Sequence, residues 1–286
     1  MKLFLLLICE LFISAIAIAQ TPDQVLIRVR YTYINSIDTL KNGKPRIENM
    51  LLFAGKNNSL YTSYDKINFE VALDQKVRAM VLAHVDDGKP KSFKIDQSSS
   101  EWMSKLTHYY FAKENKFFVK EKVAFQDYFF QEENASLKWK ITTDTLSFSG
   151  IKCRKAIGTY KGKNWTAWFA PSLPFQSGPW KLNSLPGLII EAFDENKETY
   201  FQFAGLENAK EGDFVRTHDI TKGPNAEPGF INTVDVMMGI DIASAYFTNF
   251  IQLPTYVVKT TKAQVEKLKA AYKKDPKGFE KIQAKF

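Results

Sequence analysis

The sequence predicts a mostly β protein of the α+β class, with a single curved antiparallel sheet or half-barrel, a few packed helices and one C-terminal amphipathic helix. Three observations support this prediction. Aromatic residues make up 14% of the chain, largely as Phe and Tyr in short runs that are typical of strands. Several segments alternate apolar and polar side chains with the period of two of a half-buried strand. The connections between them are short and polar, as in an antiparallel meander.

The N-terminus has the three parts of a secretory signal peptide. Lys2 precedes an apolar run over residues 3–18, and the small residues Ala17 and Ala19 stand before Gln20. The run of roughly 15 apolar residues is short for a membrane-spanning helix, which needs about 20. We therefore expect cleavage after residue 19 and export to the periplasm, the extracellular space or the outer-membrane surface.

Residues 20–286 are predicted to form a single β-rich domain, because no internal repeat or low-complexity linker divides them. No further apolar run of about 18 residues follows, so no transmembrane segment is expected in the mature chain. Cys153 is then its only thiol, which excludes an intrachain disulfide. Cys153 lies in an alternating segment and is interpreted as a small buried hydrophobe, with a catalytic or metal-binding thiol as the alternative.

The first half of the chain predicts a meander followed by a helix. Alternation predicts strands over residues 25–33, 49–54 and 59–63, which short polar turns separate. Apolar residues then recur at helical spacing over residues 65–84, and the polar segment 86–100 is predicted to be a loop. Further strands are predicted over residues 117–119, 125–130, 137–141, 151–159, 164–170, 188–193 and 199–204.

Two helices are predicted near the C-terminus. Residues 232–250 are apolar nearly all round, which indicates a helix buried on more than one side. A second, amphipathic helix follows a capping box formed by Thr261 and Gln264, and Pro276 ends it. Its apolar face carries Val265, Leu268 and Tyr272.

The net charge of +8 is concentrated at the C-terminal end. Nine lysines and three acidic residues lie between Lys259 and Phe286, which gives +6 there and leaves the rest of the chain close to neutral. We interpret these lysines as the solvated face of the helix, with contact to anionic lipid or polysaccharide as the alternative. No nucleic-acid partner is predicted.

The segment between Trp139 and Glu191 carries a family resemblance. It contains Gly150-Ile151-Lys152-Cys153, Thr166-Ala167-Trp168-Phe169, Gly178-Pro179-Trp180-Lys181 and Leu185-Pro186-Gly187-Leu188-Ile189. These blocks resemble the GLPGLI family of secreted Bacteroidetes proteins, which has no established biochemical activity. Ser184 stands where the family motif begins with glycine. If the family's backbone has a positive φ at this position, a serine would have to adopt it here.

Leu185-Pro186-Gly187-Leu188 is predicted to form a tight type II turn that enters a strand. Proline sets φ at the second position of such a turn, and glycine supplies the positive φ at the third. The motif contains no carboxylate, thiol or imidazole, so its chemistry is conformational. Burial of its apolar side chains, at about 1.5 to 3 kcal/mol each, is enough to explain it by folding; the alternative is a turn that contacts a ligand.

Trp165 and Trp168 should point to opposite faces of their strand, so that both cannot be core on a one-sided sheet. One of them is therefore a candidate for an aromatic binding surface, unless other elements cover the second face. The predicted ligand-binding residues are Trp165, Trp168, Trp180, Leu185, Pro186, Gly187 and Leu188.

No catalytic residue, metal ligand or cofactor is predicted. The histidines His84, His108 and His218 lack the spacing of a metal site, and the sequence has no nucleophile-elbow or phosphate-binding motif. Glu191, with Asp194 and Glu195 nearby, is the weak alternative of a carboxylate pair for glycoside hydrolysis.

These features favour a non-catalytic binding protein. Its ligand would be an apolar chain or lipid, a peptide, or an envelope or outer-membrane partner protein. Two hypotheses from other classes stay open: a secreted hydrolase that depends on Cys153 or a histidine, and a purely structural envelope protein.

Overall fold

The computed structural model describes residues 22–39, 43–82, 102–124, 126–135, 137–209, 250–254, 257–276 and 278–279. The predicted signal peptide, the predicted loop over residues 86–100 and residues 232–249 of the predicted apolar helix lie outside the described residues. Among the described residues, no helix has both the length and the apolar character needed to cross a membrane.

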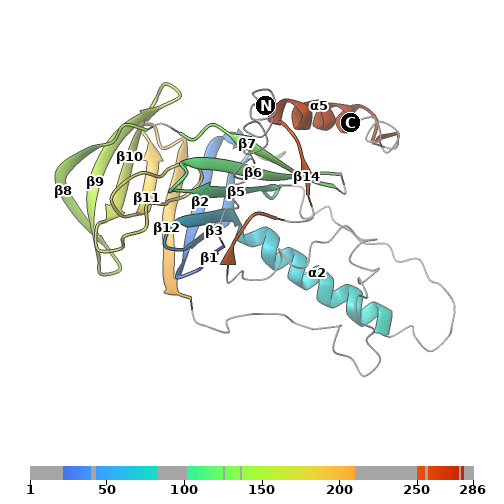
Figure 1. Ribbon diagram of the computed structural model, residues 1–286, viewed down its shortest axis with the longest axis horizontal. Helices are drawn as coiled ribbons and strands as arrows, with labels where there is room; N and C mark the ends of the chain where they lie inside the picture. Colours follow the sequence, from blue (N-terminus) through green and yellow to red (C-terminus); the bar gives the residue numbers. More distant parts are fainter. Residues whose placement is uncertain are drawn as a thin grey trace, which may run out of the picture.

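Twelve strands form one large curved sheet that stays open (Figure 1). Their order across the sheet is β14-β7-β6-β5-β4-β3-β2-β12-β11-β10-β9-β8, and every pair is antiparallel except β14 with β7. The strands are β2 (Ile27–Thr39), β3 (Pro45–Ala54), β4 (Asn58–Ser63), β5 (Leu106–Phe111), β6 (Lys116–Val123), β7 (Gln126–Glu132), β8 (Lys140–Phe148), β9 (Ile151–Tyr160), β10 (Lys163–Ala170), β11 (Leu188–Asp194), β12 (Thr199–Asn208) and β14 (Val258–Lys259). A separate two-stranded sheet pairs β1 (Asp23–Gln24) with β13 (Phe250–Ile251).

The predicted fold class is confirmed: the protein is mostly β, with a curved sheet and a C-terminal helix. The N-terminal meander is also confirmed as β2, β3 and β4, and the predicted helix after it is α2 (Tyr64–Leu82). Among the longer strands, β5 was not predicted, because five of its six residues are buried and its sequence shows no polar alternation. The two-residue strands β1, β13 and β14 were not predicted either, and β8 was predicted only in its first two residues. Phe250 was placed in a helix by the sequence and lies instead in β13.

Both faces of the sheet are covered near its middle. We call one side the loop face; it carries Tyr31, Leu52 and Trp165, and the segment over residues 171–187 packs on it. The other side is the α2 face, where Leu51 and Phe53 pack against Ile67 of α2. Strands β8 to β10 curl away at the end of the sheet farthest from the helices (Figure 1). Among the described residues, no helix lies over that end.

The C-terminal helix α5 (Lys262–Lys274) begins as predicted, with both hydrogen bonds of the Thr261 capping box. Val265 and Leu268 are buried in an apolar cluster with residues of β6 and β7. The lysine face is less solvated than expected. Lys262 bonds to Glu132 of β7 at 2.5 Å, and Lys269 bonds to Glu121 of β6 at 2.8 Å.

The motif turn before β11 differs from the predicted type II turn. The Gly187 N–H donates to the carbonyl of Leu185 at 2.8 Å, while the Leu188 N–H donates to Leu173 at 2.9 Å. A type II turn would instead join Leu188 to Leu185. The reason is tight packing, because a Cβ on Gly187 would lie 2.3 Å from the carbonyl oxygen of Ala170. Only glycine lets the two backbone segments approach this closely.

Replacing Gly187 by alanine is expected to lower the free energy of unfolding by at least about 3 kcal/mol, because the new methyl group meets fixed backbone and φ is +152°. Gly150→Ala is the matched control: φ there is +85°, but nothing lies within 4 Å of the added carbon, so a loss of about 1 kcal/mol is expected. Urea unfolding measures both. Equal losses in the two variants would contradict the close-approach explanation.

Candidate binding site

Trp165 and Trp180 lie on the loop face and form part of the core. Their ring centroids are 5.9 Å apart, and Trp165 stacks on Phe201 at 6.3 Å. Trp165 is 3% exposed, whereas Trp180 is half-buried. These indoles therefore hold the segment 171–187 against the sheet.

The motif turn is also largely internal. Leu185 and Leu188 are 1% and 0% exposed, Gly187 is buried, and Pro186 alone of the four is exposed. Ser184 has φ of +68°, which is the left-handed conformation that favours glycine. The turn thus contributes chiefly to packing.

Trp168 lies on the opposite face from Trp165, as the sequence predicted. The register pairs it with Lys155 of β9 and Glu191 of β11, so that all three lie on the α2 side of the sheet. Its half-buried indole packs edge-to-face on Phe148 at 6.4 Å, and Phe148 packs on Phe203 at 6.3 Å. We call Phe148, Trp168 and Phe203 the aromatic patch; all three are partly exposed.

Glu191 is held in place beside the aromatic patch. Its carboxylate accepts hydrogen bonds from the Tyr200 hydroxyl at 2.6 Å and from the Phe203 N–H at 3.2 Å. Burial, together with the bond to Glu191 and its negative charge, raises the pKa of Tyr200. Each oxygen of Glu191 therefore accepts one hydrogen bond, which fixes the carboxylate and suits a structural or ligand-orienting role.

The acidic residues do not form the carboxylate pair that glycoside hydrolysis would require. Strand alternation places Asp194 on the face opposite Glu191. Asp194 is 1% exposed and accepts hydrogen bonds from Lys163 at 2.8 Å and from the Glu198 N–H at 2.7 Å. Its role is to fix the turn between β11 and β12.

Cys153 is a buried thiol at 1% exposure, as its interpretation as a small hydrophobe requires. Burial, and then the charge of Glu191, raises its pKa to about 11. The thiol is consequently protonated at neutral pH and is a poor nucleophile. Among the described residues, no group of three or more His, Cys, Asp or Glu side chains is arranged to hold a metal ion.

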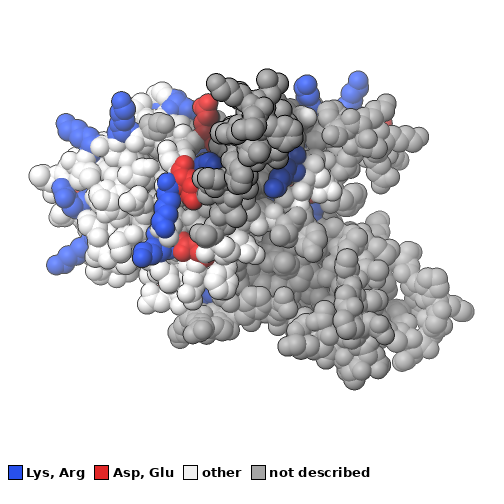
Figure 2. Space-filling view, viewed as in Figure 1, with Lys and Arg blue, Asp and Glu red and all other residues white. Residues whose placement is uncertain are grey.

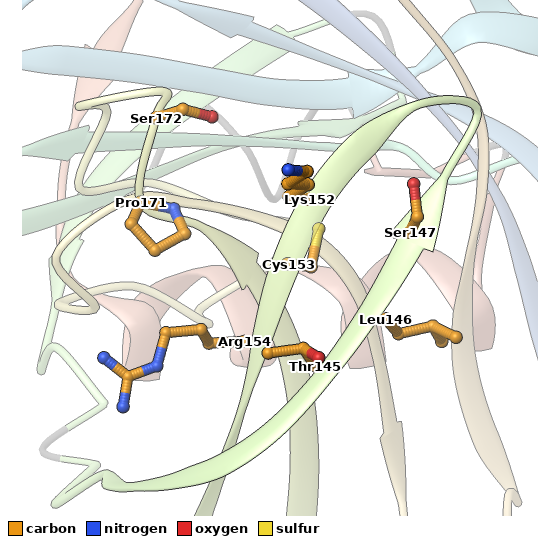
Figure 3. Close-up of a pocket in the computed structure, with 8 residues that line it drawn as sticks. All are labelled: Thr145, Leu146, Ser147, Lys152, Cys153, Arg154, Pro171 and Ser172. Atoms are coloured by element: carbon orange, nitrogen blue, oxygen red, sulfur yellow. The ribbon is translucent and has the colours of Figure 1, made fainter.

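An open groove of about 750 Å³ lies beside Cys153 at the hairpin of β8 and β9 (Figure 3). Cys153 lies in the middle of the lining, with Pro171 and Ser172 on one side and Leu146 and Ser147 on the other. The remaining lining residues are Thr145, Lys152 and Arg154. Pro171 follows Ala170, which contacts Gly187, so the motif turn supports one wall of the groove.

The same end of the sheet is strongly basic. Between residues 138 and 163 the chain has seven Lys or Arg residues and one acidic residue, Asp144. The side chains that project from the β8–β10 end in Figure 2 are Lys and Arg. This local charge is hidden when the C-terminal end is compared with the average of the rest of the chain. A count in a sliding window would have found it.

His108 is the one histidine among the described residues, and it is 6% exposed on the loop face of β5. Its Nδ1 atom is buried without a hydrogen-bond partner, and its ring lies 5.6 Å from that of Phe117. Burial is the main cause that lowers its pKa to about 4. It is a neutral core residue and lies apart from the groove.

Comparisons with known proteins add little to this description. No family model and no curated protein matches the chain. Two solved structures of PNGF-II, in the P21 and C2 space groups, are similar to it with TM-scores of 0.48 and 0.46. Each is 12% identical, and the matches cover 85% and 84% of this chain. The match spans about a third, 32%, of the length of either PNGF-II chain.

His108→Gln is expected to remove part of the pH dependence of stability. The imidazole titrates near pH 6.5 in the unfolded chain but near 4 in the folded one, so the unfolded state takes up the proton first as the pH falls. Wild-type protein should therefore lose about 2 kcal/mol more than the variant between pH 7 and pH 5. Denaturant unfolding at both pH values measures this difference. Parallel losses would mean that His108 is not buried as a neutral ring.

Proposed function

We propose that the chain is an exported, non-catalytic binding protein that holds a peptide ligand at the β8–β10 end of the sheet. The observation that carries the proposal is the position of Trp168. It is a half-buried indole in an aromatic patch, on the face opposite the core indole Trp165. It lies at the end of the sheet that no helix of the described part of the chain covers. Partly exposed aromatic side chains of this kind are frequent anchors in recognition surfaces.

The chemistry of the neighbouring groups supports binding over hydrolysis. The Cys153 thiol is buried and protonated, and the Glu191 carboxylate is 9% exposed and accepts two hydrogen bonds. A nucleophile or general base would need a free, accessible atom in this place. The groove instead offers a mostly apolar surface with Lys152 and Arg154 in its lining, which suits the apolar and acidic side chains of a peptide.

Export and membership of the GLPGLI family belong to the same proposal. The N-terminal sequence supports export. The backbone at Ser184 supports the family assignment. Its φ of +68° is a conformation that glycine adopts readily, and the family motif has glycine at this position. On this view, the motif keeps the loop face packed and leaves the opposite face for recognition.

Trp168→Ala is expected to weaken peptide binding while the protein stays folded. The test is selection of a phage-displayed random peptide library on the immobilised protein, followed by binding of the enriched peptides to the variant. Loss of an aromatic anchor costs about 2 kcal/mol, so binding should weaken about thirtyfold.

Trp102→Ala is the matched control, because Trp102 is also a half-buried indole but precedes β5. Thermal unfolding should show that both variants remain folded. If the enriched peptides bind Trp168→Ala as tightly as wild-type protein, the proposed site is wrong.

A further inference from the structure

The strand β8 is one edge of the sheet, and its last four residues are open for pairing. No strand of the described chain lies on the far side of β8. Its first part is distorted by a shift of register between Ile141 and Thr145, but residues 145–148 pair regularly with β9. A regular edge presents backbone donors and acceptors on which another strand can add.

The hairpin geometry identifies which backbone groups face outward. Phe148 and Ile151 close a two-residue turn at Ser149 and Gly150, both with positive φ, and such a closing pair exchanges both of its hydrogen bonds. Antiparallel pairs alternate between bonded and non-bonded. The next pair, Ser147 with Lys152, is therefore non-bonded, and its backbone N–H and C=O on β8 point away from β9. The same alternation applies to Thr145.

The side chains around this edge differ between its two faces. On the α2 face, Leu146 is 46% exposed and is followed by Phe148, which contacts Trp168. On the loop face, Thr145 and Ser147 stand beside Arg154 and Lys152, their partners on β9. Both basic side chains are exposed. A strand added to β8 would thus meet an apolar surface on one side and positive charge on the other.

We propose, on the basis of the proposed function, that β8 binds an extended segment of a partner protein in which acidic and apolar residues alternate. Pairing to the backbone of Thr145 and Ser147 would place the acidic side chains on the face of Lys152 and Arg154 and the apolar ones beside Leu146 and Phe148. The alternation matches the strand period of two. A second copy of this chain is disfavoured as the occupant, because edge-to-edge pairing would bring two basic edges together.

The test uses the full chain and three labelled eight-residue peptides, with fluorescence anisotropy at low ionic strength. One peptide alternates Glu and Val, the second has the same residues in two blocks, and the third alternates Lys and Val. The first peptide should bind at least about tenfold more tightly than the other two. Equal binding of the alternating and blocked Glu peptides would overturn the proposal.

The variant Lys152→Glu/Arg154→Glu should reverse the charge preference and select the Lys-Val peptide. The control Lys161→Glu/Lys259→Glu makes the same change in net charge at exposed lysines away from the pocket lining, and it should keep the wild-type preference. An unchanged preference in the first variant would contradict recognition by this edge.

Ser147→Pro removes an outward N–H without removing a bond to β9, so the hairpin should still form. It should weaken the Glu-Val peptide about tenfold, whereas Ser147→Ala, which keeps the N–H, should not. If Trp168→Ala loses phage-selected peptides while Ser147→Pro retains them, the binding function stands and strand addition is wrong. Dimerisation of wild-type protein that Ser147→Pro abolishes, measured by sedimentation velocity, would make a second copy the occupant and also overturn the proposal.

Discussion

The approach of Gly187 to Ala170 determines how the whole β8–β12 half of the sheet is covered. At this point the chain returns from the segment 171–187 into β11, and the missing side chain lets the backbone lie against the end of β10. The segment is consequently pressed onto the loop face, where Leu182 and Leu185 are buried. The chain itself fills that face, where Trp165 lies, and strand alternation places Trp168 on the opposite, α2 face.

A single carboxylate connects the segment 171–187 with the helix α5, which both pack on the loop face. Glu132 of β7 pairs both with Lys181 of the segment 171–187 and with Lys262 of α5. Burial alone would raise the pKa of Glu132, but the hydrogen bonds from the two lysines outweigh it and lower the pKa. If either lysine is removed, the partly buried Glu132 carboxylate is left with one cationic partner instead of two. The segment 171–187 and the helix α5 are therefore coupled through Glu132.

Local sequence was sufficient to predict much of the fold. Period-two alternation predicted the meander, and the Thr261 capping box predicted α5, because both features depend on neighbouring residues. The strand β5, which is buried except at Leu106, was missed because it shows no alternation. The turn type was also wrong, because the partner of the Leu188 N–H is Leu173, whose position depends on the tertiary fold.

The candidate site was predicted only in part. Alternation correctly separated Trp165 from Trp168, but the strand period could not say which indole faces the core. That choice is made by the segment 171–187, which brings Trp180 onto Trp165. Phe148 was missed as a neighbour of Trp168, and Phe203 as a neighbour of Phe148, because these residues come from strands that are not adjacent in the sheet.

The two edges of the sheet explain why recognition is expected at β8. The other edge, β14, is two residues long and leads directly into α5, so it offers little backbone for pairing. An exposed edge is an aggregation hazard unless charge or a bulge protects it. At β8 the irregular register before Thr145 prevents regular pairing along the first half of the strand. Lys152 and Arg154 repel other strand edges that carry positive charge. The same two features leave a short regular segment of β8 that admits a partner strand only if that strand is negatively charged. Protection against self-association and selection of an acidic partner therefore have one physical origin.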